Sequence, residues 1–205
     1  MYVYRLLGRS MQYLDLKSLL LVFFLLPLLS GCGLIAAGGM AAGVGTGIAM
    51  SQDRRTSGMF VEDESIEFRS GQRISEKFSS NVHVNVTSFN RNVLLTGEAP
   101  SETIKEEIGD LVSNVENVRH VTNEITVGSP SSFTSRGNDT LITSLVKGHF
   151  MDSGRFQANH VKVVTEEGIV YLLGLVKGEE AENAEELAKR VDGVKKVVKV
   201  FEYME

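Results

Sequence analysis

The sequence predicts an α+β fold built from two tandem copies of one small module. Two observations predict it. Residues 62–205 contain an internal repeat, and within each copy segments of alternating apolar residues flank an apolar stripe at helical spacing. Hydrophobic residues make up 42% of the 205-residue chain and charged residues 23%, so the chain can form packed cores and is not a disordered tail.

One single-residue gap brings the two copies into register. Val84 matches Val161 at an offset of 77 residues, and this offset holds up to the glycine that closes the second expected strand. Beyond the next loop the offset becomes 76, which pairs Leu111 with Leu187. Two unrelated segments would rarely align over this length with a single gap, so we interpret the two halves as copies of one module.

Each copy is expected to fold in the order α-β-β-α-β. The first two strands are close enough to form a hairpin. The second and third strands are joined through a helix, as parallel neighbours require, so each module is a three-stranded mixed sheet packed on two helices. The expected elements are strands 82–86, 93–96 and 121–127 around a helix capped by Ser101 in the first copy, and strands 160–165, 169–173 and 197–203 around helix 179–191 in the second.

The helix that precedes each hairpin has a weaker pattern. In the second copy, Asn138 or Asp139 is expected to cap it after a linker rich in Ser, Gly and Pro, residues 129–138. In the first copy, Gly71 is expected to interrupt it. Modules of this size have marginal cores, so we expect them to pack on each other or on a partner. The two domains are expected at 62–128 and 139–205.

Residues 1–31 are expected to be a secretion signal. Arg5, Arg9 and Lys17 precede an uncharged apolar run, Ser18–Leu29. Twelve residues rise only about 18 Å as a helix, which is too short for a bilayer core of about 30 Å. The run therefore fits a cleaved signal better than a membrane-spanning helix.

The signal ends in Leu29-Ser30-Gly31-Cys32, which resembles the bacterial lipobox. In that motif the chain is cut before the cysteine, which is then acylated on its sulfur and on the new amino group. The alternative is an ordinary signal peptidase site beside a chance cysteine. Gly33 stands where lipoproteins retained in the inner membrane often have aspartate, so the resemblance implies lipidation of Cys32 and anchoring in the inner leaflet of the outer membrane, on the periplasmic face. Because Cys32 is the only cysteine, the chain has no disulfide framework.

The charge balance limits the partners. Cleavage before Cys32 removes three basic and one acidic residue from totals of 21 and 26, which leaves 18 and 25 and a net charge of −7. This balance lacks the basic footprint of a nucleic-acid-binding protein. It also opposes general attraction to an anionic membrane, so any lipid headgroup must be bound by a local patch.

Residues 32–61 are expected to tether the modules to the anchor. The stretch is rich in glycine, and Gly39, Gly43 and Gly47 recur every four residues. We interpret it as a flexible leash near the membrane, because glycine-rich chain is costly to order. The alternatives are a small-residue helix zipper and an uncleaved segment that stays embedded in the membrane.

Several segments of the two copies resemble a known domain family. The segments VLLTGEA and VYLLGLV, each followed by a helix and then by VENVRHVTNEI or VDGVKKVVKVFEY, resemble the BON domain. The lipobox, the leash and the two copies together resemble dual BON-domain outer-membrane lipoproteins. This resemblance implies a protein that is not an enzyme, that binds anionic phospholipid mainly through the first helix of the second BON domain, and that supports envelope integrity. Leu141 departs from the pattern, which has an aromatic residue there.

The candidate lipid helix has more apolar surface than a core contact needs. From Asp139 to Met151 its apolar residues cover an arc of about 180°, whereas a core-facing helix needs a stripe of about 100°. Ile142, Val146 and Phe150 are the core candidates.

Leu141 and Leu145 are the surplus, and Met151 lies outside the arc. With Lys147 they make up the predicted phospholipid-binding residues, Leu141, Leu145, Lys147 and Met151. The apolar side chains would enter the membrane interface while the lysine meets a phosphate of a phosphatidylglycerol-like lipid. The alternative buries Leu141 and Leu145 against the first domain.

A rival interpretation is a protein-interaction adaptor. In that case the same helix or an exposed strand edge docks an envelope protein, and the acyl anchor alone contacts the membrane. A second basic patch favours either membrane attraction or, more simply, a solvated surface near a helix C-terminus. It consists of Lys189, Arg190, Lys195, Lys196 and Lys199.

Signals for catalysis, cofactors and metals are weak. Ser144 and Lys147 fit the pattern S-x-x-K, but the motifs that accompany it in serine enzymes are absent. The four histidines lack the spacing of metal ligands. We therefore expect no catalytic residue, no cofactor and no metal site.

Overall fold

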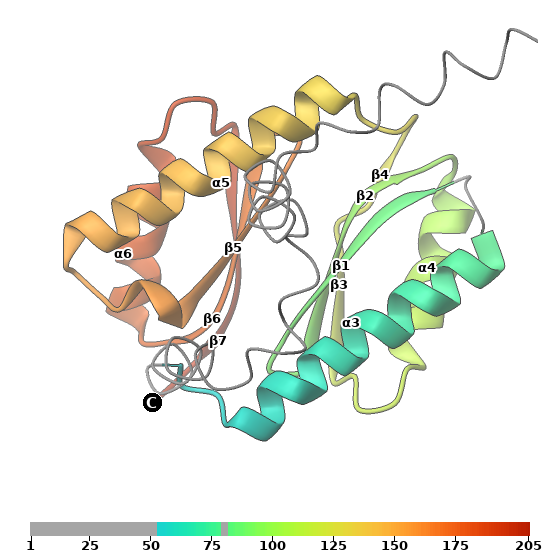
Figure 1. Ribbon diagram of the computed structural model, residues 1–205, viewed down its shortest axis with the longest axis horizontal. Helices are drawn as coiled ribbons and strands as arrows, with labels where there is room; N and C mark the ends of the chain where they lie inside the picture. Colours follow the sequence, from blue (N-terminus) through green and yellow to red (C-terminus); the bar gives the residue numbers. More distant parts are fainter. Residues whose placement is uncertain (1–52, 79–81) are drawn as a thin grey trace, which may run out of the picture. The chain divides into compact units, whose positions relative to one another are not determined.

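The computed structural model describes residues 53–78 and 82–205, which form two α+β repeats within one compact unit of the chain (Figure 1). The expected signal peptide, Cys32 and the glycine-rich segment lie outside these residues. Among the described helices, none combines the length and the apolar character that crossing a bilayer requires. The elements are α3 (Ser57–Phe78), β1 (His83–Phe89), β2 (Asn92–Ala99), α4 (Glu102–Ser113), β3 (His120–Asn123), β4 (Thr126–Val127), α5 (Phe133–Ser153), η2 (Ala158–His160), β5 (Val161–Glu166), β6 (Ile169–Val176), α6 (Gly178–Lys189) and β7 (Lys196–Tyr203).

Both repeats have the expected topology. β1 pairs antiparallel with β2, and β5 pairs antiparallel with β6. The crossover through α4 makes β3 and β4 parallel to β2, and the crossover through α6 makes β7 parallel to β6. The fold class, two tandem helix-strand-strand-helix-strand modules with mixed sheets, is therefore confirmed. The third strand of the first repeat is split into β3 and β4, and Val127 at its end is half exposed.

The two helices of each repeat cover one face of its sheet (Figure 1). Ile66, Ile108 and Val112 from α3 and α4 pack on Val93 and Leu95 of the first sheet. In the second repeat the predicted core residues of α5 are buried against β5, β6 and α6. They are Ile142, Val146 and Phe150, so the prediction of the inward side of this helix is confirmed.

The first helix of each repeat is longer than the sequence predicts. α3 continues without a break through Gly71. α5 begins at Phe133, where the side chain of Ser132 accepts a hydrogen bond from the backbone N–H of Ser135 at 3.1 Å. The prediction that Asn138 or Asp139 caps α5 is wrong, and half of the expected linker is helical, because a serine earlier in that linker supplies the cap.

The repeated glycine marks a close approach of two backbones. A Cβ added at Gly97 would overlap the carbonyl oxygen of His83 on the neighbouring strand, and one at Gly174 would overlap the carbonyl oxygen of His160. Gly97 also has φ of +109°. Only glycine satisfies this spacing in both copies, which explains why it recurs at the same offset.

The repeats pack on each other through the sheet faces that the helices leave open. A shared cluster buries Phe89 and Leu94 from the first sheet with Tyr171 and Leu173 from the second. The expectation that two marginal modules pack together is confirmed. The central strands β2 and β6 are thus buried on both faces, which explains their nearly continuous apolar sequences.

Tyr171 gives this junction a pH dependence. Burial, with smaller contributions from Glu124, Glu166 and Glu167, raises the pKa of its phenol to about 12. The folded protein therefore prefers the neutral phenol. The free energy of unfolding should be unaffected by this group well below pH 10 and should fall by about 2 kcal/mol as the pH rises from 10 to 12. Chemical unfolding of Tyr171→Phe beside the unchanged chain at pH 9 and 12 checks this, because the variant should lose less stability over that interval.

Candidate functional site

Helix α5 is fixed to its sheet at its middle and along its inner side. The buried carboxylate of Asp139 accepts hydrogen bonds from the backbone N–H groups of Glu167 at 3.0 Å and Gly168 at 2.8 Å, in the turn between β5 and β6. Thr143 donates to Thr165 on β5 at 2.7 Å. These contacts determine which side of α5 faces away from the core.

The side of α5 that faces away from the core is apolar. Leu141 is 56% exposed, Leu145 42% and Met151 68%, and the side chain of Lys147 is exposed among them. The alternative in which Leu141 and Leu145 are sealed against the first repeat does not occur, because the repeats meet through their sheets. All four predicted residues therefore lie together on the exposed surface of one helix.

Phe133 extends this surface and was missed by the sequence analysis. It is 88% exposed in the first turn of α5, and at about 100° per residue it lies on the same side as Met151. The guanidinium of Arg136 lies over its ring at 4.6 Å. Recognising Ser132 as a helix cap would have brought Phe133 into the helix. We call Phe133, Leu141, Leu145, Lys147 and Met151 the outer face of α5.

The charge on this surface is positive. Asp139 is the only acidic residue from Phe133 to Met151, and its carboxylate is turned inward to the hairpin. Lys147 forms no ion pair within residues 53–78 and 82–205. The next acidic residue, Asp152, is exposed at the end of the helix. An anion that approaches the outer face of α5 therefore meets a free ammonium group next to apolar side chains.

The first repeat provides an internal comparison. In the first helices the offset is 76, one residue less than in the hairpins that follow, so Asp63 corresponds to Asp139. Both accept hydrogen bonds from the turn of their own hairpin. The inward positions are therefore equivalent in α3 and α5. The outward positions are not, because Leu141, Leu145, Lys147 and Met151 correspond to Ser65, Arg69, Gly71 and Ser75. At these four positions only the second repeat has the apolar row, whereas the exposed apolar residues of α3, Phe60, Val61 and Phe68, stand at other positions.

The second basic patch is largely neutralised. Lys189 and Lys199 both pair with Glu185, and Arg190 pairs with Glu186. Hydrogen bonds from Lys189 and Lys199 lower the pKa of the Glu185 carboxyl, and Arg155 and, to a smaller extent, Arg190 lower that of Glu186. Of the five residues of this patch, only Lys195 and Lys196 have no ion pair in the described part of the chain. The patch therefore attracts anions less than its sequence indicates.

A pocket of about 580 Å³ opens at the C-terminal end of α5, lined by Met151, Phe156 and Arg54 among others. The guanidinium of Arg54 already forms two hydrogen bonds with the carboxylate of Glu180, at 2.7 and 2.8 Å, and these hold the pKa of Glu180 at about 2. Its charge is therefore satisfied within the protein.

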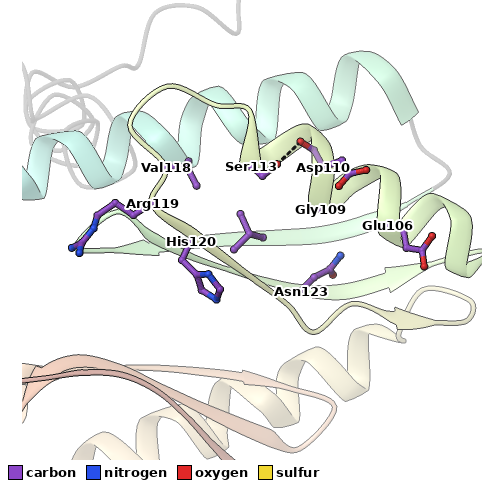
Figure 2. A pocket seen from close by; sticks show the side chains of 9 residues that line it. Glu106, Gly109, Asp110, Ser113, Val118, Arg119, His120 and Asn123 are labelled. Carbon is purple, nitrogen blue, oxygen red and sulfur yellow. Dashed lines mark hydrogen bonds between the residues drawn. The ribbon is translucent and has the colours of Figure 1, made fainter.

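A second pocket, of about 450 Å³, lies between α4 and β3 of the first repeat (Figure 2). Acidic residues Glu106 and Asp110 line one side, and Arg119 and His120 come from the other. The Ser113 hydroxyl donates to the Asp110 carbonyl at 2.8 Å, so it is held by the helix itself. None of the predicted lipid-binding residues lines this pocket.

The S-x-x-K pair has no catalytic arrangement. The hydroxyl of Ser144 donates to the carbonyl oxygen of Thr140 at 2.9 Å, one turn earlier in α5. A serine bound in this way satisfies the helix backbone, as is common for serine within helices.

Comparison with known families agrees with this architecture. The BON domain model matches residues 62–129 and 138–205, and the chain belongs to the BON-domain family. It is a two-BON-domain lipoprotein, a class of proteins that are not enzymes.

Within this class the chain is similar to the outer membrane lipoprotein DolP of Haemophilus influenzae, with 36% identity over 194 residues that cover 93% of this chain and 97% of the relative. It is therefore a DolP-like outer-membrane lipoprotein. A 21 kDa hemolysin of Actinobacillus pleuropneumoniae is 34% identical over 75% of this chain and 80% of its own. The osmotically-inducible protein Y of Escherichia coli is 26% identical over 88% of this chain and 92% of its own.

Proposed function

We propose that this DolP-like lipoprotein is anchored through acylated Cys32 on the periplasmic face of the outer membrane and binds anionic phospholipid through the outer face of α5. In this role it supports the integrity of the envelope. The observation that carries the proposal is a row of exposed apolar side chains beside Lys147, which has no ion pair among the described residues, on a helix whose other side is fixed to the core.

The chemistry of the outer face fits a membrane interface. Leu141, Leu145 and Met151 can insert among the upper parts of the acyl chains, where each square ångström of apolar surface removed from water contributes about 25 cal/mol. The ammonium of Lys147 can remain at the level of the phosphates. One cation near an anionic surface contributes about 1 kcal/mol, so charge selects the lipid while apolar burial supplies most of the affinity.

The lipid anchor makes such a weak contact effective. An acylated Cys32 would hold both repeats close to the leaflet, so that binding by α5 becomes an event within one tethered molecule at high effective concentration. Because the mature chain has a net charge of −7, most of its surface is repelled by anionic lipid, which favours contact through the outer face of α5.

Liposome flotation tests the proposal without the anchor. Residues 51–205 contain both repeats and lack Cys32. This fragment should float with vesicles that contain phosphatidylglycerol and should remain in the soluble fraction with vesicles of neutral phosphatidylcholine. Equal binding to both vesicles, or binding to neither, would contradict the proposal.

Two charge changes on α5 should have opposite effects. Lys147→Gln should weaken binding to phosphatidylglycerol vesicles about fivefold, and Asp152→Asn should strengthen it by a similar factor, because each alters one charge at the membrane surface. Titration of the same fragment with vesicles at low and high salt measures both. Lys195→Gln, in the second basic patch, is the control and should leave binding unchanged. If Lys195→Gln weakened binding as much as Lys147→Gln, the lipid contact would lie elsewhere.

The adaptor interpretation stays as the second candidate because of the pocket between α4 and β3. β3 is an edge strand of its sheet, and strand edges beside pockets are common docking sites for peptides. In this case the chain would bind an envelope protein through this strand edge or through α5 itself, and substitutions on α5 would have no effect on membrane binding by the anchored protein.

A further inference from the structure

Three side chains that can bind a metal ion converge where the two repeats meet. His83 comes from β1, Glu98 from β2 and Glu166 from the end of β5. One ligand atom of each lies within 4.8 Å of the others. The sequence analysis found no metal-ligand spacing, because the three residues are far apart along the chain and the junction between the repeats brings them together.

The two carboxylates, of Glu98 and Glu166, are buried with few hydrogen-bond partners. The side chain of Glu98 is 2% exposed, and its Oε1 atom has no hydrogen-bond partner among the described residues. Glu166 is 7% exposed and accepts one hydrogen bond from Asn85 at 2.8 Å. Two neighbouring buried carboxylates need a counter-charge, and an orphaned oxygen indicates a missing ligand.

We propose that His83, Glu98 and Glu166 form a binding site for one divalent metal ion of the zinc type that joins the two repeats. One imidazole nitrogen and two carboxylate oxygens are donors that zinc accepts, and three protein ligands leave a fourth position for water. Ligand atoms of a tetrahedral zinc ion lie about 3.4 Å apart. Displacements of about 1 Å in the three side chains would therefore bring their ligand atoms to this spacing. His83 is a quarter exposed, which gives the ion a path from solvent.

Arg136 competes with the ion. Its Nη1 lies 3.1 Å from Nε2 of His83, while Nδ1 of the same ring lies 2.9 Å from Oε2 of Glu98. Neutral His83 with its proton on Nδ1 satisfies both contacts. A metal ion bound at Nδ1 moves the proton to Nε2, and one bound at Nε2 takes the place of the guanidinium, so Arg136 must withdraw in either case. Removing Arg136 should therefore strengthen metal binding.

Isothermal titration with Zn²⁺ alone tests this site, in the full mature chain held in detergent and without a polyhistidine tag. We expect one Zn²⁺ per chain, no binding of Mg²⁺, and a higher Tm with Zn²⁺. Glu98→Gln should weaken Zn²⁺ binding at least tenfold, and Arg136→Gln should strengthen it at least threefold. His83→Gln, at a partly exposed position, repeats the loss if Glu98→Gln does not fold. His120→Gln, on the first repeat but outside the cluster, is the matched control and should bind as the unchanged chain does.

Three outcomes would overturn the site: no binding at a ratio of one, affinity that persists in His83→Gln, or a loss in His120→Gln as large as that in His83→Gln. Because the readouts are metal affinity and Tm, the result does not depend on whether α5 binds lipid.

Discussion

Replacing Leu141 and Leu145 together with aspartate should reduce binding of residues 51–205 to phosphatidylglycerol vesicles at least hundredfold. The change removes the two central apolar side chains of the outer face of α5 and places two negative charges against an anionic surface. Each lost leucine contact costs about 1 kcal/mol for its exposed half, and each repelled charge about as much. Vesicle titration followed by flotation measures the loss.

The control for this double variant is Phe68→Asp. Phe68 is 72% exposed on α3, so it tests whether any exposed apolar residue would serve. We expect Phe68→Asp to bind as the unchanged chain does. Both variants should unfold at the same denaturant concentration as the unchanged chain, because the replaced side chains lie outside the cores. If the double aspartate variant still bound phosphatidylglycerol vesicles, α5 would not be the membrane contact.

Asp63→Ala should lower the free energy of unfolding by about 4 kcal/mol. The carboxylate of Asp63 accepts hydrogen bonds from Ser88 Oγ at 2.7 Å and from the backbone N–H groups of Asn90 at 2.8 Å and Arg91 at 2.7 Å. It also pairs with Arg55 at 2.8 Å. Removing it leaves these three donors without their partner, and a hydrogen bond to a charged group contributes about 1.5–3 kcal/mol. The guanidinium of Arg55 loses one of its two carboxylates and keeps its pair with Asp53 at 2.7 Å.

Urea unfolding measures this loss against two references. Asp139→Ala removes the equivalent carboxylate of the second repeat, which accepts two backbone hydrogen bonds and has no ion pair of its own, so it should cost about 2 kcal/mol. Asp192→Ala, at an exposed position, should change the free energy of unfolding by less than about 0.5 kcal/mol. If Asp63→Ala unfolded like Asp192→Ala, the hairpin turns would not depend on these carboxylates.

The sequence contains enough information for the fold of each repeat. The offset between Val84 and Val161 identifies the module, and alternation and helical spacing identify its elements. The inward side of α5 follows from Ile142, Val146 and Phe150 alone. These predictions succeed because they depend on local periodicity, which burial of one face imposes on any strand or helix.

The role of Asp139 and the packing between the repeats depend on non-local contacts, whereas the start of α5 is set by the local cap Ser132. Asp139 looks like a helix cap in the sequence, but its carboxylate bonds to a hairpin turn more than 25 residues away. Tyr171 and Leu173 alternate with the core residues of β6, and nothing local shows that their face meets a second sheet. The equivalence of Asp63 and Asp139 in the two repeats was the one signal in the sequence that these two carboxylates fix their helices to the hairpins.

The candidate lipid site was predictable in part, because the periodicity of α5 is local. The surplus width of the apolar arc on α5 identified Leu141 and Leu145, and the structure places both on the surface. Phe133 was missed because the helix was expected to begin after it. The cluster of His83, Glu98 and Glu166 could not be predicted, since it forms only where two repeats of unknown arrangement meet.

Photocrosslinking from position 141 in intact cells tests the central claim most directly. A photoreactive amino acid in place of Leu141, in the full-length lipoprotein, reports what the outer face of α5 touches in the envelope. We predict that phospholipid is the main adduct at this position and that no lipid adduct forms from the equivalent position of the first repeat, Ser65. A discrete protein adduct at 141, with no lipid attached, would contradict the account and favour the adaptor.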